Sequence, residues 1–193
     1  MKLKNIPNIL SISRICLVFV FIALFFSLDQ PYAALLVFLL AGATDVVDGY
    51  LARRNNWISN LGKILDPFAD KLMQCTVLIC LYIKNFIPLW FVLPFIFKEL
   101  FTLVIGLVVI KRRSVAVVSK WYGKFTVCLF YATIAISMIF KAYLSAHPIL
   151  SYVIFVPAVV SALITLVAYV KHYAFLKKLE PKKGDLLKMR KEQ

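Results

Sequence analysis

The chain has 193 residues, of which 62% are hydrophobic, and its mean hydropathy is +0.86. Soluble domains are usually about half apolar, so this composition argues against a soluble protein and indicates a single-domain membrane protein. The net charge of +14 would suit nucleic acid, but the basic residues lie mainly at the ends of apolar runs and in the C-terminal tail. That placement indicates contact with lipid headgroups and argues against nucleic acid as a partner.

Six apolar segments follow one another along the chain, and each is about twice as long as a strand of a membrane β-barrel. Because about 20 apolar residues cross a bilayer as a helix, we expect an all-α integral membrane protein with six transmembrane helices. The expected helices cover residues 8–28, 31–53, 62–83, 86–110, 121–144 and 148–169. We assign residues 1–175 to one six-helix membrane domain and residues 176–193 to a basic cytoplasmic tail.

Lysine and arginine are enriched in alternate loops. They gather at the N-terminus, between the second and third helices, between the fourth and fifth helices, and in the tail. By the positive-inside rule these segments lie in the cytoplasm, so both termini are expected there. Six spans satisfy this pattern, whereas five would place the tail on the other side. We therefore expect a multi-pass protein of the plasma membrane.

Acidic residues are concentrated in an unusual place. Five of the nine lie in the predicted helices or at their cytoplasmic ends, namely Asp45, Asp48, Asp66, Asp70 and Glu99. Ionisable groups are costly there, and they indicate a functional site. Spacings of three residues within the first pair and four within the second place each pair on one helix face. A tight antiparallel hairpin of the second and third helices would bring the four aspartates together.

Four clustered carboxylates would repel one another unless cations neutralise them. Their oxygen ligands favour Mg²⁺, Mn²⁺ or Ca²⁺, and four carboxylates can hold two ions for a displacement at phosphorus. Gly49, Ala52 and Gly62 would allow backbones or a ligand to approach closely, although packing alone would also explain them. Arg53 is suited to binding a phosphate or to setting topology, and Pro67 is expected to bend or open the third helix.

These residues form one pattern along the chain. It is Asp45-x2-Asp48-Gly49-x2-Ala52-Arg53-x8-Gly62-x3-Asp66-x3-Asp70. The pattern resembles the signature of the CDP-alcohol phosphatidyltransferase family, with eight fixed residues across 26 positions. Further forward, Asn5-Ile6-Pro7-Asn8, Ser11 and Arg14 resemble the N-terminal pattern of bacterial phosphatidylglycerophosphate synthases and of the related cardiolipin synthases. The six expected helices agree with this family as well, so the resemblance covers most of the chain, although its motifs lie in the first half.

The resemblance implies transfer of a phosphatidyl group from CDP-diacylglycerol to a small alcohol, with release of CMP. It implies that Asp45, Asp48 and Asp66 hold two Mg²⁺ or Mn²⁺ ions per subunit. It further implies that Asp70 holds one of these ions and is the catalytic base for the incoming hydroxyl. The implied CDP-binding residues are Asn8, Ser11, Gly49, Ala52, Arg53 and Gly62. A homodimer with its active site at the cytoplasmic side is also implied.

The acceptor alcohol is the part that the sequence determines least. A phosphate-bearing acceptor such as glycerol 3-phosphate would need cations, and the candidates are Lys98, Lys111, Arg112, Arg113, Lys120 and Lys124. Phosphatidylglycerophosphate synthases carry an Arg-Glu pair in the fourth helix, where this chain has Lys98-Glu99. Lysine lacks the bidentate fork of arginine, and the two residues could equally pair with each other. The basic cluster after the fourth helix could equally be a topology signal.

Glycerol 3-phosphate is the acceptor that we expect. Alternatives are phosphatidylglycerol, as in a cardiolipin synthase, and serine or an inositol phosphate. A cation transporter is an alternative from another class of protein. A transporter would spread its acidic residues over several helices and through the depth of the membrane, whereas four of them lie here in two consecutive helices.

Overall fold

The structure is a computed structural model that describes the backbone of residues 6–55, 62–113 and 121–178. Side chains are described for residues 10–44, 65–106, 121 and 123–171. In order, the elements are α1 (Ile6–Ile22), the π-helical turn η2 (Ala23–Ser27), α2 (Pro31–Asn55), α3 (Gly62–Ile83), α4 (Leu89–Arg113), α5 (Trp121–Ile139), α6 (Lys141–Ala146) and α7 (Pro148–Lys178). All elements within the described ranges are helical, so the predicted all-α class is confirmed.

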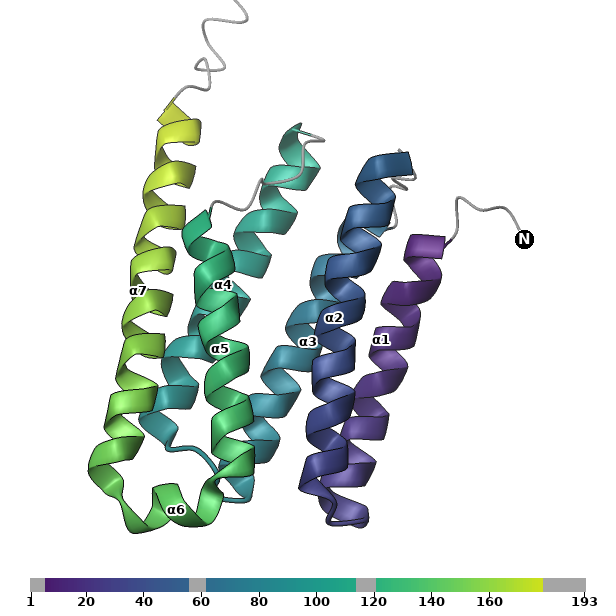
Figure 1. Ribbon diagram of the computed structural model, residues 1–193. Coiled ribbons are helices and arrows are strands. Elements are labelled where there is room, and N and C mark those ends of the chain that lie inside the picture. Colours follow the sequence, from purple (N-terminus) through teal and green to yellow (C-terminus); the bar gives the residue numbers. More distant parts are fainter. Residues whose placement is uncertain (1–5, 56–61, 114–120, 179–193) are drawn as a thin grey trace, which may run out of the picture.

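The long helices lie on the predicted segments, although α7 continues to Lys178 where the prediction ended at residue 169, and there are two further differences. α3 continues through Pro67, so of the two effects expected of this proline, bending or opening the helix, opening is wrong. The fifth segment divides, because α5 ends at Ile139 and the short helix α6 runs across the end of the bundle (Figure 1). The break brings Lys141 against the neighbouring connection, where its ammonium group donates to the carbonyl of Lys84 at 3.0 Å. It also lies 4.0 Å from the ring centroid of Phe86.

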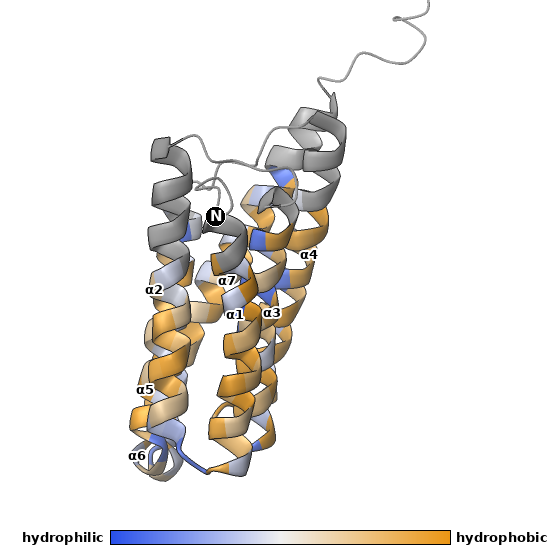
Figure 2. Cartoon of the chain, turned by 90° about the vertical axis from the view of Figure 1, so that its right-hand side faces the viewer, coloured by the Kyte–Doolittle hydropathy of each residue, from blue (hydrophilic) through white to orange (hydrophobic). Residues whose placement is uncertain are grey.

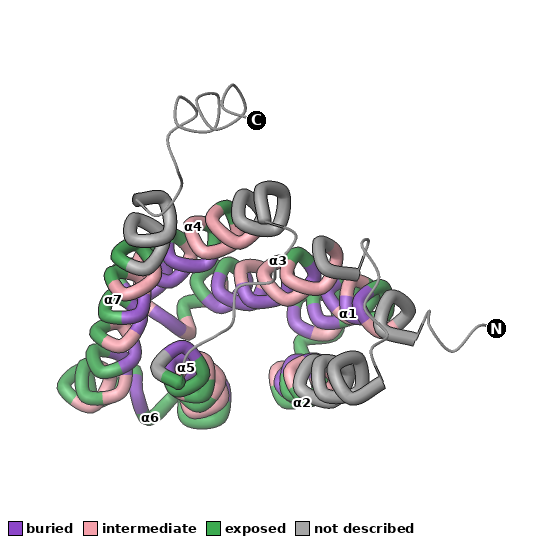
Figure 3. Tube along the Cα trace, turned by 90° about the horizontal axis from the view of Figure 1, so that it is seen from above, coloured by how far each residue is buried: buried purple, intermediate pink, exposed green. Residues whose placement is uncertain are grey.

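The long helices alternate in direction (Figure 1). α2 ends and α3 begins at the same end of the bundle as the start of α1 and the end of α7. We call this the signature end, because the residues of the sequence signature lie in this part of α2 and α3. Seen from above, α1, α3, α4 and α7 form one row, and α2 and α5 form a second (Figure 3).

Each long helix contacts its neighbours in a ring rather than in simple chain order. Around the ring the order is α1, α3, α4, α7, α5, α2 and back to α1. The consequence for the site is that α1 packs against both α2 and α3, while α2 and α3 contact each other far less. The two helices that carry the signature therefore pack on α1 more than on each other within the described residues.

Three helices within the described residues are long and apolar enough to cross a membrane. The apolar stretches in them are Leu10–Ser27, Leu89–Gly106 and Pro148–Lys171. Shorter apolar stretches lie at Pro31–Thr44 and Gly123–Ile139. Hydrophobic residues make up most of the helices of the bundle, and hydrophilic residues lie among them on α3 and α4 (Figure 2). This distribution is typical of a membrane-embedded protein, in which polar groups among apolar helices indicate a functional site.

Aromatic side chains form much of the core of the bundle. Phe95 contacts Phe130 of α5 with ring centroids 5.2 Å apart, and Phe91 contacts Phe155 of α7 at 4.8 Å. These rings are buried. On α4 the aromatic core ends at Phe95, and the buried polar residues of the site begin at the next turn. The aromatic core therefore packs directly against the site, on the side away from the signature end.

The end of the bundle opposite the signature is tied together by Lys84. Its ammonium group donates to the carbonyl of Phe25 at 2.6 Å and to the carboxylate of Asp29 at 2.5 Å. The hydrogen bond from Lys84 holds the pKa of the exposed Asp29 below its usual range. These contacts join the connection between η2 and α2 to the end of α3.

We expect Lys84→Met to lower the thermal unfolding temperature more than Asp29→Asn, because the lysine also satisfies the carbonyl of Phe25. A carboxylate with a lowered pKa stabilises the folded state above its ordinary pKa of about 4, and the effect is lost as pH falls. The difference between wild type and Asp29→Asn should therefore shrink as the pH is lowered from 6 towards about 3. Thermal unfolding in detergent checks both expectations, and a constant difference across this range would contradict the second.

Candidate functional site

Asp66 lies at the interface between α3 and α1. Arg14 of α1 places its Nη1 atom 3.3 Å from Oδ1 of Asp66, and the Ser11 hydroxyl donates to the same oxygen at 3.4 Å. Ser11 and Arg14 are three residues apart, so they share one face of α1. Both are 1% exposed, whereas the Asp66 side chain is 43% exposed. α1 therefore holds Asp66 from the buried side and leaves the carboxylate accessible from the other.

Asp70 lies one helical turn further along α3 and has partners on its own helix. The amide of Gln74 donates to both carboxylate oxygens of Asp70, at 3.1 Å and 3.3 Å. Lys71 places its Nζ atom 3.3 Å from Oδ2 of Asp70. Gln74 is buried, and Asp70 is partly exposed. The orientation of the carboxylate is thus fixed by two side chains that approach it from the protein interior.

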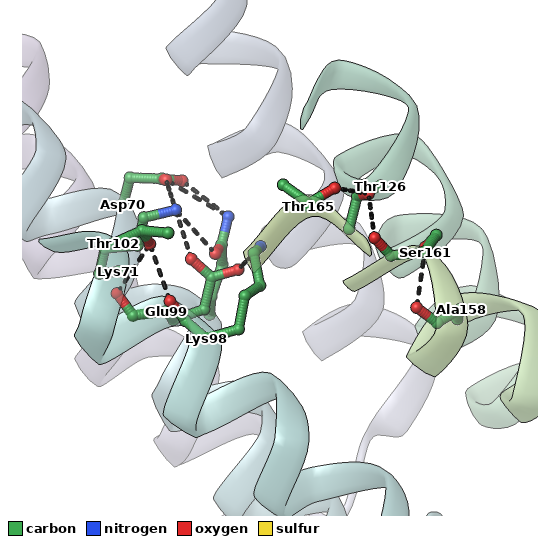
Figure 4. A network of polar contacts seen from close by, with 10 residues as sticks. Asp70, Lys71, Lys98, Glu99, Thr102, Thr126, Ala158, Ser161 and Thr165 are labelled. Carbon is green, nitrogen blue, oxygen red and sulfur yellow. Dashed lines mark hydrogen bonds and ion pairs between the residues drawn. The ribbon is translucent and has the colours of Figure 1, made fainter. Parts of the chain in front are cut away.

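A buried ion pair on α4 continues this network (Figure 4). Glu99 forms an ion pair with Lys71 at 2.5 Å and a second ion pair with Lys98. Lys98 and Glu99 are 4% and 2% exposed. The hydroxyl of Thr102 donates to the carbonyls of Lys98 and Glu99, one turn earlier on the helix. Lys98 thus has the pairing with Glu99 that the sequence analysis gave as the alternative to binding the acceptor.

The other half of the signature lies on α2. Asp45 and Asp48 are in the part of α2 that approaches the signature end, but their side chains lie outside the described residues. The same holds for Asn8 and for Gly49, Ala52, Arg53 and Gly62 of the expected CDP site, whereas Ser11 is described and contacts Asp66. The backbone does place these positions at the end of the bundle where Asp66 and Asp70 lie.

The chemistry of the described carboxylates fits a hard divalent cation. Asp66 and Asp70 lie four residues apart, are partly exposed, and offer only oxygen ligands, which Mg²⁺ and Mn²⁺ prefer. Among the side chains that the structure describes, no three acidic, histidine or cysteine groups come together as a metal cluster. A four-carboxylate site would need Asp45 and Asp48 as well.

The predicted acceptor residues are only partly covered. Arg112 and Arg113 lie in the last turn of α4 with side chains outside the described part, and Lys111 shares that position. Lys120 lies in a range that is not described, and Lys124 is exposed near the start of α5. The structure therefore groups Lys98 with Asp70 through a shared network. It does not join Lys124 to that network by any described contact.

Sequence reasoning missed three residues that hold the carboxylates. The sequence places Arg14 in an N-terminal pattern without indicating that it contacts Asp66, and it suggests no role for Lys71 or Gln74. A signal for them did exist. Gln74 follows Asp70 at a helical spacing of four, and Lys71 is a charge within an apolar run; both features indicate partners for a buried acid.

Comparison with known proteins identifies the class of molecule. A model of the CDP-alcohol phosphatidyltransferase family matches residues 4–173. The chain therefore belongs to the CDP-alcohol phosphatidyltransferase family, and the resemblance inferred from the signature is confirmed. Its members transfer a phosphatidyl group, which agrees with carboxylates gathered at one end of an apolar bundle.

Several curated proteins are similar to part of this chain. The chain is 46% identical over 86 residues to a protein of Rickettsia typhi named CDP-diacylglycerol--glycerol-3-phosphate 3-phosphatidyltransferase; the match covers 43% of this chain and 48% of that protein. A Bacillus subtilis protein of the same name is 37% identical over 109 residues, covering 49% and 56%. A cardiolipin synthase (CMP-forming) of Streptomyces coelicolor is 41% identical over 108 residues, covering 53% and 50%. The chain thus spans about half the length of the curated relatives it matches.

Proposed function

We propose that this chain transfers a phosphatidyl group from CDP-diacylglycerol to glycerol 3-phosphate and releases CMP. The observation that carries this proposal is the complete eight-residue signature of the family, placed on α2 and α3 at one end of the bundle. Relatives named for the glycerol 3-phosphate reaction support the choice of acceptor.

In this proposal Asp45, Asp48, Asp66 and Asp70 hold two Mg²⁺ or Mn²⁺ ions, which would neutralise the pyrophosphate and the charge developing on CMP. Asp70 accepts the proton of the attacking hydroxyl, a task that suits a carboxylate held in a fixed orientation by Gln74 and Lys71. The proposed CDP-binding residues are Asn8, Ser11, Gly49, Ala52, Arg53 and Gly62. Ser11 and Arg14 also hold Asp66 in place.

We propose six membrane spans with both termini and the active site on the cytoplasmic side of the plasma membrane. Supporting this, the start of α1, the end of α7 and the signature residues share one end of the bundle (Figure 1). Protease digestion of tags at either terminus, in vesicles of both orientations, tests the topology. The homodimer is a separate proposal, which mass measurement of the protein in lipid nanodiscs tests.

The acceptor is tested by supplying purified protein with CDP-diacylglycerol, Mn²⁺ and one acceptor at a time, and following CMP release. Glycerol 3-phosphate should support release. Release with phosphatidylglycerol and not with glycerol 3-phosphate would instead establish cardiolipin synthesis, the second candidate, which the Streptomyces coelicolor relative favours. No release with any acceptor, including serine and inositol phosphate, would refute the proposed activity.

We expect chelation of divalent ions to abolish CMP release, because the carboxylate cluster would otherwise repel the pyrophosphate of the donor. Adding Mg²⁺ or Mn²⁺ in excess of the chelator should restore the activity. The thermal unfolding temperature should also rise when Mn²⁺ is returned, since a bound ion stabilises the folded state. Full activity in the presence of chelator would contradict the metal requirement.

A further inference from the structure

Four alternating charges connect α4 to Asp70 of α3 (Figure 4). Lys98 pairs with Glu99, Glu99 pairs with Lys71, and Lys71 pairs with Asp70. The sum of these charges is zero, so each cation has a carboxylate beside it. Burial decreases along the series, from 2% exposure of the Glu99 side chain to 18% for Lys71 and 21% for Asp70. The Lys98–Glu99 end of the network is thus buried, and the Asp70 carboxylate at the other end is accessible.

Lys71 connects the two halves of this network. Its Nζ atom contacts Glu99 at 2.5 Å, Asp70 at 3.3 Å and the amide oxygen of Gln74 at 3.4 Å. A lysine side chain is long and flexible and carries three donors without a fixed geometry. The short contact with Glu99 on a neighbouring helix is therefore what fixes its ammonium group in space.

We propose that Glu99 is a positioning residue for the reaction: it anchors Lys71, and through Lys71 it fixes the orientation of the Asp70 carboxylate. This inference rests on the proposed function, in which Asp70 accepts the proton of the acceptor. Gln74 also binds Asp70, but it lies on α3 and moves with it. Among these described contacts, the ion pair of Lys71 with Glu99 is the one that connects Asp70 to a helix other than α3.

A simpler role for Glu99 would be to neutralise the buried Lys98. The two roles differ in what a charge-balanced double variant does. Glu99→Gln leaves two lysines with one carboxylate, whereas Glu99→Gln/Lys98→Met restores the balance and leaves Lys71 without its anchor. Neutralisation alone predicts that the double variant recovers both stability and turnover. Positioning predicts that it recovers stability only.

The test uses the full chain in detergent–lipid micelles, with kcat and KM for CDP-diacylglycerol measured at saturating acceptor, and thermal unfolding measured alongside. For Glu99→Gln we expect kcat to fall about 10- to 100-fold, since a small misplacement of a reacting group has this effect, with KM changed by less than about threefold. The unfolding temperature should fall in Glu99→Gln and recover in the double variant, while kcat stays low. Lys98→Met alone should keep a higher kcat than the double variant.

Several results would overturn the positioning role. They are a wild-type kcat in Glu99→Gln, recovery of kcat in the double variant, and a kcat in Lys98→Met as low as in the double variant. Should Glu99→Gln fail to fold, the comparison of the double variant with Lys98→Met decides the matter. Wild-type protein that releases no CMP would refute the proposed function and the positioning role together. A normal wild type beside an unaffected Glu99→Gln would refute positioning alone.

Discussion

Asp70→Asn is expected to lower CMP release at least about 100-fold, because a positioned general base typically contributes a factor of 10² to 10⁴. Asparagine has the same shape and can still bond to Gln74, so the local fold should persist. It cannot accept a proton from the attacking hydroxyl. Binding of CDP-diacylglycerol should be largely retained, because the other proposed metal ligands and the proposed CDP-binding residue Arg53 remain. Turnover measured by CMP release, and binding measured with a fluorescent CDP-lipid, check the two parts separately.

Asp29→Asn is the matched control for this experiment. It makes the same chemical change at a carboxylate that also pairs with a lysine, but at the opposite end of the bundle. Its CMP release should remain at the wild-type level at neutral pH. Wild-type turnover in Asp70→Asn would remove Asp70 from the mechanism, and equal losses in both variants would point to general damage to the fold.

Gly42→Ala is expected to destabilise the protein by about 1–3 kcal/mol, the usual cost of overpacking a filled core. A Cβ atom at Gly42 would lie 2.5 Å from the ring of Tyr131 on α5. That ring cannot easily move away, because it is stacked on Phe38 with centroids 4.4 Å apart. The clash would therefore push α2 away from α5. Thermal unfolding in detergent measures the effect.

Gly106→Ala provides the control, since nothing lies within 4 Å of the Cβ atom that it would add on α4. It should leave stability unchanged or raise it slightly, because alanine favours helix by up to about 1 kcal/mol over glycine. Replacing the Tyr131 ring by the smaller leucine side chain, in the double variant Gly42→Ala/Tyr131→Leu, should recover part of the lost stability. Equal unfolding temperatures for Gly42→Ala and wild type would show that Tyr131 does not press on α2.

The positions of the helices could be predicted from the sequence because each is a long apolar run with its own boundaries. The division of the fifth segment could not, since the residues at the break contact a connection far away in the chain, as Lys141 does at the carbonyl of Lys84. The order in which the helices follow one another around the ring could not be predicted from the sequence either. That order depends on tertiary contacts such as Phe38 with Tyr131 and Phe91 with Phe155, which no local pattern encodes.

The acidic part of the site was accessible to sequence reasoning because charge in an apolar run is conspicuous and the spacing of Asp66 and Asp70 is helical. Their partners were harder to find. Arg14 lies 52 positions from Asp66 in the chain, and Glu99 reaches Asp70 only through Lys71. Pairings of this kind follow from the packing of α1 and α4 on α3, which becomes visible only in three dimensions.

Because α1 packs against both α2 and α3, it matters for any attempt to build this site into a designed protein. Although the signature is contiguous in the sequence, its two halves lie on helices that both pack against α1, which contributes none of its eight residues. A two-helix peptide excised from Pro31 to Ile83 would lack Ser11 and Arg14, the partners of Asp66 on α1. A portable unit for protein design therefore has to include α1 beside α2 and α3, and it also needs α4 if Asp70 is to keep its link through Lys71 to Glu99.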